Sequence, residues 1–189
     1  MTLEILKKSL LEAPVVKKGD YFYVVHPITD GVPEIKPELL NEVVDDLQNR
    51  IEKCGKIDKI VTIEAMGIPL ATALSSNMNV PFVIIRKRSY GLPGEFKIEQ
   101  KTGYSKSNLF INGLKKGHKI VIVDDVLSTG GTLKAIIIAL KEIGVEIKGI
   151  FIVINKGNIA KKFEDEFKIN IETIANIEVI DEKVNIKKI

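Results

Sequence analysis

Short apolar segments of strand length alternate along this chain with segments whose apolar residues recur at helical spacing, and this alternation constrains the fold most. The strand-like segments are 21–25, 57–63, 81–85, 108–111, 119–123 and 145–154, with further strands expected near the C-terminus. The helix-like segments are 2–12, 37–54, 66–78, 130–143 and 159–167. Strands that alternate with helices favour a mostly parallel sheet with helices on both faces. The sequence therefore predicts a single α/β domain over residues 1–189.

Composition excludes several classes of protein. A hydrophobic content of 45% with 28% charged residues is that of a globular protein, and a net charge of +3 does not support bulk binding of nucleic acid. The longest apolar runs, 135–140 and 150–154, fall far short of the ~20 residues that span a bilayer. The single Cys54 allows no internal disulfide, and the first residues lack a signal-peptide core. We expect a cytoplasmic protein without nucleic-acid or membrane partners.

Residues 89–107 differ from the rest of the chain, because they are rich in Gly, Lys, Ser, Gln and Tyr and carry few apolar anchors. Ordinary connections in compact domains are much shorter, and long ones are usually functional lids or disordered segments. The sequence predicts a long loop here.

The segment 121–132, VIVDDVLSTGGT, carries the strongest chemical signal. An apolar strand runs into Asp124 and Asp125 and then into a small-residue loop that opens a helix. Backbone N–H groups and hydroxyls at a helix N-terminus bind anions, and the carboxyl edge of a parallel sheet is where ligands bind. Two carboxylates beside such a loop are useful only if they hold hydroxyls or a divalent cation of the same ligand. The segment therefore predicts a sugar-phosphate site, although an isolated Asp or Ser there would more often only cap the helix.

At these residues the chain resembles the type I phosphoribosyltransferases, whose phosphoribosyl pyrophosphate signature is similar to 121–132. Three further segments carry the likeness: 59–68 (KIVTIEAMGI) resembles the pyrophosphate loop of adenine and xanthine enzymes, 83–94 the Arg-Lys segment of adenine enzymes, and 104–109 the end of the mobile catalytic loop. As a whole, the chain looks most like the archaeal hypoxanthine/guanine enzymes. The resemblance implies a central, mostly parallel sheet flanked by helices, a small hood from about 1–36 and 155–189, and a mobile loop at about 89–107.

The resemblance also implies roles for individual residues. Asp124 and Asp125 would hold the ribose hydroxyls directly or through Mg²⁺, and Tyr104 would act in catalysis from the mobile loop. The remaining contacts to phosphoribosyl pyrophosphate would come from the 5′-phosphate loop Ser128, Thr129, Gly130, Gly131 and Thr132, from the backbone amides of Ala65, Met66 and Gly67, and from the cations Arg86, Lys87 and Arg88. Relatives place such cations near a dimer interface, so a homodimer is expected.

The base would be read by Lys156, which lies in a segment that resembles the 6-oxo contact of xanthine enzymes. A lysine donates to O6 of hypoxanthine or guanine and finds no acceptor on the 6-amino group of adenine. Thr29 and Asp30 lie where xanthine enzymes place a second base contact, although an ordinary turn is the commoner reason for such residues. Ser128, Gly103 and Met66 depart from the patterns of related enzymes, so no general base is assigned.

The resemblance thus implies a purine salvage enzyme that makes IMP or GMP from hypoxanthine or guanine. Adenine as the substrate is one alternative. A regulator that senses phosphoribosyl pyrophosphate is another, although the residues before Pro37 look too few and too little basic for a DNA-binding module. A pyrimidine-specific relative is a third alternative, which the purine-type segments disfavour.

Overall fold

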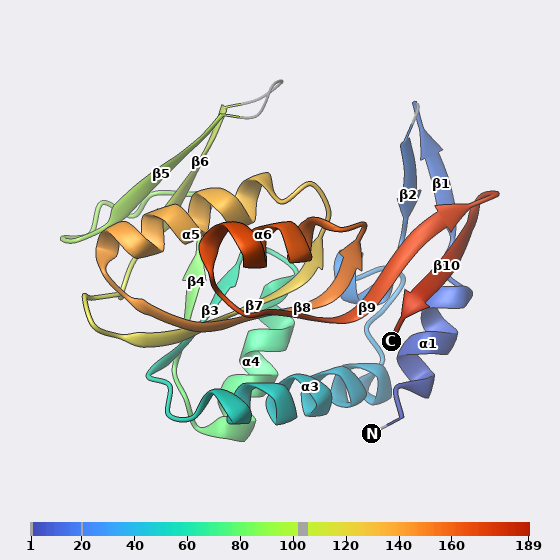
Figure 1. The fold of residues 1–189 in the computed structure, drawn as a ribbon, viewed down its shortest axis with the longest axis horizontal. Coiled ribbons are helices and arrows are strands. Elements are labelled where there is room, and N and C mark those ends of the chain that lie inside the picture. The colour runs from blue at the N-terminus through green and yellow to red at the C-terminus, as the bar shows by residue number, and fades with distance from the viewer. Residues whose placement is uncertain (1, 20, 102–105) are drawn as a thin grey trace.

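The computed structural model describes residues 2–19, 21–101 and 106–189, and Figure 1 shows their arrangement. The helices are α1 (Glu4–Leu11), α2 (Pro27–Asp30), α3 (Pro37–Ile51), α4 (Gly67–Met78), α5 (Gly131–Ile143) and α6 (Ile159–Phe167), with a 3₁₀ turn at Glu52–Cys54. The strands are β1 (Val15–Lys18), β2 (Tyr21–Val24), β3 (Lys59–Ile63), β4 (Phe82–Ile85), β5 (Phe96–Lys101), β6 (Lys106–Ile111), β7 (Lys119–Leu127), β8 (Glu146–Lys156), β9 (Ile171–Ile180) and β10 (Lys183–Lys188).

The central sheet has six strands in the order β10-β9-β8-β7-β3-β4. All neighbouring pairs are parallel except β10 with β9, which is antiparallel. β7 therefore lies inside the sheet, between β3 and β8, with its carboxyl end surrounded by the ends of its neighbours. The prediction of a mostly parallel sheet flanked by helices is confirmed.

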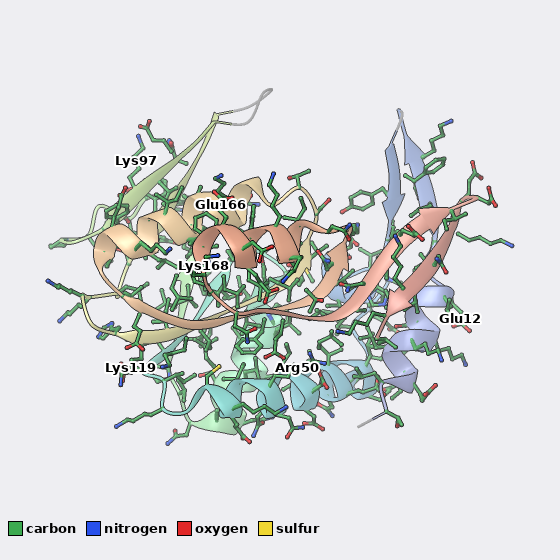
Figure 2. The ribbon with its side chains drawn as sticks, in the orientation of Figure 1. Glu12, Arg50, Lys97, Lys119, Glu166 and Lys168 are labelled. Atoms are coloured by element: carbon green, nitrogen blue, oxygen red, sulfur yellow. The ribbon has the colours of Figure 1, made fainter. Side chains whose placement is uncertain are left out.

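Alternating residues of the inner strands face two separate cores. On β7, Val121 and Val123 pack with α1, α3 and α4, whereas Ile120 and Ile122 pack with α5 and α6. Figure 1 shows these two helical layers on opposite sides of the sheet. Strands buried on both faces are apolar at most positions, which is why long stretches of these strands are apolar in the sequence. Exposed charged residues such as Glu12, Lys97 and Lys119 extend outward from the periphery (Figure 2).

Two antiparallel hairpins stand outside the central sheet. β1 pairs with β2, and β5 pairs with β6. Part of the segment predicted as a long loop over 89–107 forms strands, because β5 occupies Phe96–Lys101 and β6 begins at Lys106. β5 contributes Ile98 to the core, and antiparallel pairing supplies the order that this polar segment lacks as an isolated sequence. β1 likewise carries no clear strand pattern in its residues.

The element boundaries differ most at the ends of the strands that carry polar residues. β7 continues to Leu127, so Asp124 and Asp125 belong to the strand rather than to the loop after it. The β7–β8 ladder extends over these residues: Asp124 pairs with Ile152, and Leu127 pairs with Asn155. Among the described residues, no helix is both long and apolar enough to cross a membrane.

Candidate active site

The end of β7 brings two carboxylates into the interior of the protein. Asp125 is 7% exposed and Asp124 is partly buried. Adjacent residues of a strand point to opposite faces, yet the two groups remain close enough to affect each other's ionisation. Burial, and then the charge of Asp125, raise the pKa of Asp124 well above its ordinary value. Burial also raises the pKa of Asp125 to about 6, helped by the charge of Asp30 and opposed by Asp124 and Lys156. The pair is thus poised to release protons when a cation or a diol binds.

The loop after β7 lies at the N-terminus of α5 and borders a cavity of about 150 Å³. The cavity is lined by Asp124, Val126, Leu127, Ser128, Thr129, Gly130, Thr132, Leu133 and Ile152. Gly130 has φ +77°, and a Cβ on it would lie 2.7 Å from Ile159 and Phe163 of α6. Glycine is therefore required both by the turn and by the close approach of α6. Hydroxyls, N–H groups and the positive end of the helix dipole give this cavity the character of a phosphate site.

The loop between β3 and α4 lies directly against Asp124. The Glu64–Ala65 peptide bond is cis. A Cβ on Gly67 would lie 2.7 Å from Asp124 Oδ1 and would also overlap Thr62 Oγ1. Gly67 is buried, whereas Ala65 is exposed and Met66 is partly exposed. The first turn of α4 can therefore present backbone N–H groups beside the carboxylate pair only because residue 67 has no side chain.

Replacing Gly67 with alanine is expected to lower the free energy of unfolding by about 1–3 kcal/mol, because the new methyl group overlaps the Thr62 hydroxyl and crowds Asp124. Chemical denaturation would measure the change. Gly131→Ala is the matched control, since a Cβ there meets nothing within 4 Å, and its stability should equal or slightly exceed that of the wild type. A Gly67→Ala protein as stable as this control would contradict the packing described.

Glu64 ties the β3–α4 loop to the cations at the end of β4. Its Oε2 lies 3.1 Å from Arg86 Nε and accepts a hydrogen bond from the backbone N–H of Lys87 at 3.1 Å. Arg86 also exchanges two backbone hydrogen bonds with Phe110 of β6. Lys87 and Arg88 are exposed, and Arg88 stacks over the Tyr90 ring at 5.5 Å. Part of the positive charge of this cluster is thus already matched, and Lys87 and Arg88 remain accessible to an anionic ligand.

Glu95 organises the chain that follows the cations. Its carboxylate accepts hydrogen bonds from Asn112 Nδ2, Ser89 Oγ and the backbone N–H groups of Tyr90 and Gly91. These bonds, that of Asn112 foremost, hold the pKa of Glu95 at about 2. Hydrogen bonds to Glu95 therefore hold the segment from Ser89 to Glu95 in a defined turn.

On the other side of the carboxylates, a short helix and a lysine lie together. Asp30 of α2 accepts hydrogen bonds from Tyr23 OH at 2.6 Å, Thr29 Oγ1 at 2.6 Å and the His26 N–H at 3.0 Å. Although burial raises the pKa of Asp30, these hydrogen bonds lower it below its ordinary value. Lys156 Nζ, at the end of β8, lies 5.2 Å from the centre of the Tyr23 ring.

Lys156 also borders a cavity of about 270 Å³ between the β1–β2 hairpin and β9. The other residues that line it are Phe22, Val24, Gly157, Ile177, Glu178 and Val179. A larger, polar depression of about 390 Å³ lies around α6 and the start of β9. Neither Asp124 nor Asp125 lines this depression, so we place the chemistry at the carboxyl ends of β7 and β8 instead.

The site fits a divalent cation that is shared with a ligand. Mg²⁺ usually binds through one or two carboxylates together with substrate phosphates and water, and Asp124 and Asp125 supply such a pair. No cluster of three or more His, Cys, Asp or Glu side chains suited to a metal exists among the described residues. The protein therefore offers part of a coordination shell, and a ligand with several oxygen atoms has to complete it.

The structure brings together most of the residues that the sequence suggested. Asp124, the loop 128–132 and Gly67 form one continuous surface, and Asp30 and Lys156 lie near enough to Asp125 to influence its pKa. Tyr104 lies outside the described residues. Sequence reasoning missed Glu64 and the hydrogen bond from Tyr23 to Asp30, because these contacts join residues that are 23 and 7 positions apart. It also missed His26, for which the Pro at the next position was a signal of a helix start.

Comparison with known proteins agrees with this geometry. Residues 34–187 match the family model described as phosphoribosyl transferase domain. A hypoxanthine/guanine phosphoribosyltransferase of Methanothermus fervidus is 52% identical over 184 residues, which cover 97% of each chain. The enzyme of that name from Methanocaldococcus infernus is 55% identical over 182 residues, which cover 96% of this chain and 99% of the relative.

Among solved structures, adenine phosphoribosyltransferase of Saccharomyces cerevisiae superposes with a TM-score of 0.74 at 24% identity, covering 90% of this chain and 97% of the other. The adenine phosphoribosyltransferase of Thermoanaerobacter pseudethanolicus gives 0.73 at 23% identity, with 93% and 99% covered. At these identities the structures establish the fold alone. Together with the match over residues 34–187 and the relatives above 50% identity, they show that the chain belongs to the phosphoribosyltransferase family.

Proposed function

We propose that this protein transfers the 5-phosphoribosyl group from phosphoribosyl pyrophosphate to hypoxanthine or guanine, giving IMP or GMP and pyrophosphate in purine salvage. The observation that carries the proposal is the juxtaposition at the carboxyl ends of β7 and β8. There a buried Asp124–Asp125 pair, a phosphate-type loop at 128–132 and Lys156 surround one site. The names of the relatives that share about half of the sequence support the same activity.

Each part of the sugar-phosphate donor has a group to bind it. Residues Ser128, Thr129, Gly130, Gly131 and Thr132 take the 5′-phosphate, and Asp124 and Asp125 accept hydrogen bonds from the ribose hydroxyls. The N–H groups of Ala65, Met66 and Gly67 bind the pyrophosphate, and Arg86, Lys87 and Arg88 supply the positive charge. Asp124 and Asp125 would hold Mg²⁺ directly or through the substrate, and the bound cation would supply positive charge to the departing pyrophosphate.

The remaining residues control the reaction around the anomeric carbon. Loss of pyrophosphate builds positive charge on the sugar, so the site has to stabilise a departing polyanion and exclude water. The cationic and N–H groups serve the first requirement. Closure of the segment at about 89–107, which includes β5 and the start of β6, serves the second, with Tyr104 acting from that segment. The hood, from about 1–36 and 155–189, covers the base within the single domain of residues 1–189.

The base half of the site favours a 6-oxopurine. Lys156 donates to O6 of hypoxanthine or guanine, and Thr29 and Asp30 contact another part of the base edge. An ammonium group has only donors, so it pairs with an oxo group and not with the 6-amino group of adenine. The solved adenine enzymes do not weigh against this assignment, because at 23–24% identity they report the fold.

A DNA-binding regulator is disfavoured by where the N-terminal residues lie. Leu6, Leu10, Val24 and Ile28 are buried in the same core as α3 and β7. These residues are therefore part of the domain and do not form a separate recognition module. We further propose that the enzyme is cytoplasmic and homodimeric. Tyr90 and Leu92, which are 49% and 55% exposed beside the Arg86–Arg88 cations, support an interface there.

The direct test offers the pure protein Mg²⁺, phosphoribosyl pyrophosphate and one base at a time, and follows nucleotide formation. Hypoxanthine, guanine, xanthine and adenine are the four bases. Turnover of hypoxanthine or guanine without turnover of adenine is expected. Turnover of adenine alone would refute the role of Lys156, and binding of phosphoribosyl pyrophosphate without any turnover would favour a sensor.

Binding of phosphoribosyl pyrophosphate with Mg²⁺ is expected to weaken as the pH falls through about 6, because Asp125 then gains a proton and loses the negative charge that attracts the cation and strengthens hydrogen bonds from the ribose hydroxyls. Below that pKa the affinity should fall by up to about tenfold per pH unit. Calorimetric titrations between pH 5 and 8 would measure this dependence. Asp125→Asn is the control for titration of the ligand itself, and it should bind more weakly with a shallower pH dependence. Identical slopes for the two proteins would contradict a role for Asp125.

A further inference from the structure

His26 is a buried side chain that the mechanism above does not use. It is 0% exposed and is the N-cap residue of α2. Its Nδ1 accepts a hydrogen bond from the Ile28 N–H at 3.2 Å. Its Nε2 lies 2.9 Å from Ser9 Oγ, so the ring joins α2 to α1.

The hydrogen bonds around the ring require the neutral imidazole. Because Nδ1 accepts from Ile28, it carries no proton, and the single ring hydrogen lies on Nε2. Ser9 Oγ donates to the Leu6 carbonyl at 2.9 Å, so its oxygen is available to accept from Nε2–H. A second ring proton would place an N–H on Nδ1 facing the N–H of Ile28, and the cap would be lost.

Nearby charges both raise and lower the pKa of the His26 ring. Burial is the main cause that lowers the pKa of His26 to about 4; the negative charge of Asp30 on α2 opposes this shift, and the positive charge of Lys156 on β8 contributes to it. On α1 the partner is the neutral hydroxyl of Ser9, and the nearby Lys8 and Glu12 are exposed to solvent. The ring is therefore neutral at physiological pH, as its hydrogen bonds require.

The residues that His26 organises are those proposed to read the base. Its backbone carbonyl accepts hydrogen bonds from the N–H groups of Thr29 and Asp30, at 3.0 and 2.9 Å. Its own N–H donates to Asp30, whose other oxygen accepts from Tyr23 OH. The Tyr23 ring in turn supports the Lys156 ammonium. α2 spans only Pro27–Asp30, so a helix this short depends on its cap and its tether for its conformation.

We propose that His26 is a positioning residue for the base half of the site, in which the neutral ring fixes α2 and, through Asp30 and Tyr23, the position of Lys156. This inference rests on the proposed function. The inference divides the site into two parts. The part that binds phosphoribosyl pyrophosphate is built on β7 and on the starts of α4 and α5, whereas the part that binds the base is built on α2 and its contact with α1.

The test compares His26→Ala, His26→Asn and Ser9→Ala with the wild type, using hypoxanthine, phosphoribosyl pyrophosphate and Mg²⁺. Loss of the cap in His26→Ala should raise KM for hypoxanthine about tenfold. KM for phosphoribosyl pyrophosphate should change little, and calorimetry should confirm that the donor still binds. Asparagine places an acceptor where Nδ1 lies, so His26→Asn should recover most of the affinity for the base. Ser9→Ala, which keeps the cap but loses the tether, should have a smaller effect of the same kind.

The outcomes separate this inference from the proposed function. Unchanged KM values in His26→Ala, or equal losses for both substrates, would overturn the inference while leaving the enzyme assignment intact. No turnover of any base by the wild type would overturn the proposed function and the inference with it. If His26→Ala does not fold, His26→Asn and Ser9→Ala decide the question. Both keep the cap and lose the tether, so each should raise KM for hypoxanthine modestly and leave KM for phosphoribosyl pyrophosphate unchanged, and equal losses for both substrates in these variants would overturn the inference.

Discussion

Turnover is expected to fall by on the order of 10³ when Asp124 and Asp125 are both replaced by asparagine, while the fold remains intact. The two carboxylates are the groups at the end of β7 that can accept the ribose hydroxyls and hold a divalent cation. Asparagine keeps the volume of each side chain but removes the charge. Steady-state rates with hypoxanthine at saturating Mg²⁺ would measure the loss.

The same double variant should be at least as stable as the wild type at pH 7. The pKa values of both groups are raised in the folded protein, so their charged forms are more costly there than in the unfolded chain. That cost is present above the folded pKa, which is about 6 for Asp125, and it disappears as the pH falls toward 4. Denaturation at pH 7 and pH 5 should therefore show any stability gain of the variant shrinking at the lower pH.

Asp45→Asn is the matched control, because Asp45 is exposed on α3 and remote from the site. It should keep both wild-type turnover and wild-type stability. Near-normal turnover of the double variant would refute the assignment of these carboxylates to the ribose and the cation.

Replacing Lys156 with methionine is expected to raise KM for hypoxanthine and guanine by about 10- to 100-fold. The substitution removes a charge-assisted hydrogen bond to O6 but keeps an unbranched stem beside Tyr23. Because adenine has an amino group at this position, any trace activity with adenine should be unchanged or increased. Kinetics with the three bases, at fixed phosphoribosyl pyrophosphate, would measure the shift in selectivity.

Lys161→Met serves as the control for the loss of a lysine charge near the end of β8. Lys161 lies on α6 with its side chain 75% exposed, and its loss should leave the base preference unchanged. If Lys156→Met uses hypoxanthine as well as the wild type does, the base contact proposed for Lys156 is wrong.

The sequence was informative where local patterns dictate local structure. Mostly apolar segments at 57–63 and 119–123 indicated buried parallel strands, because strands covered on both faces carry few polar side chains. The segment 121–132 indicated a phosphate loop, since a strand, two acids and small residues before a helix carry their chemistry in consecutive positions. For the same reason the resemblance to phosphoribosyltransferases could be recognised there.

The sequence was least informative where order comes from pairing with a distant segment. β5 is polar and reads as loop, yet its ladder with β6 and the burial of Ile98 make it a strand. The extension of β7 to Leu127 depends on its ladder with β8, whose residues lie more than 25 positions away. Polar residues such as Asp124 and Asp125 stay in a strand only because a neighbour satisfies their backbone groups.

The sequence by itself determined the class of the fold, the position of the phosphate loop and the carboxylate pair, because each is a run of consecutive residues with a fixed local geometry. Only the tertiary structure decided how these parts meet: that Gly67 lies against Asp124, that Glu64 fixes Arg86, and that His26 holds Asp30. It also decided how the carboxylates ionise, since burial and nearby charges set a pKa. Those surroundings come from strands and helices that are distant in sequence and adjacent only in the folded protein.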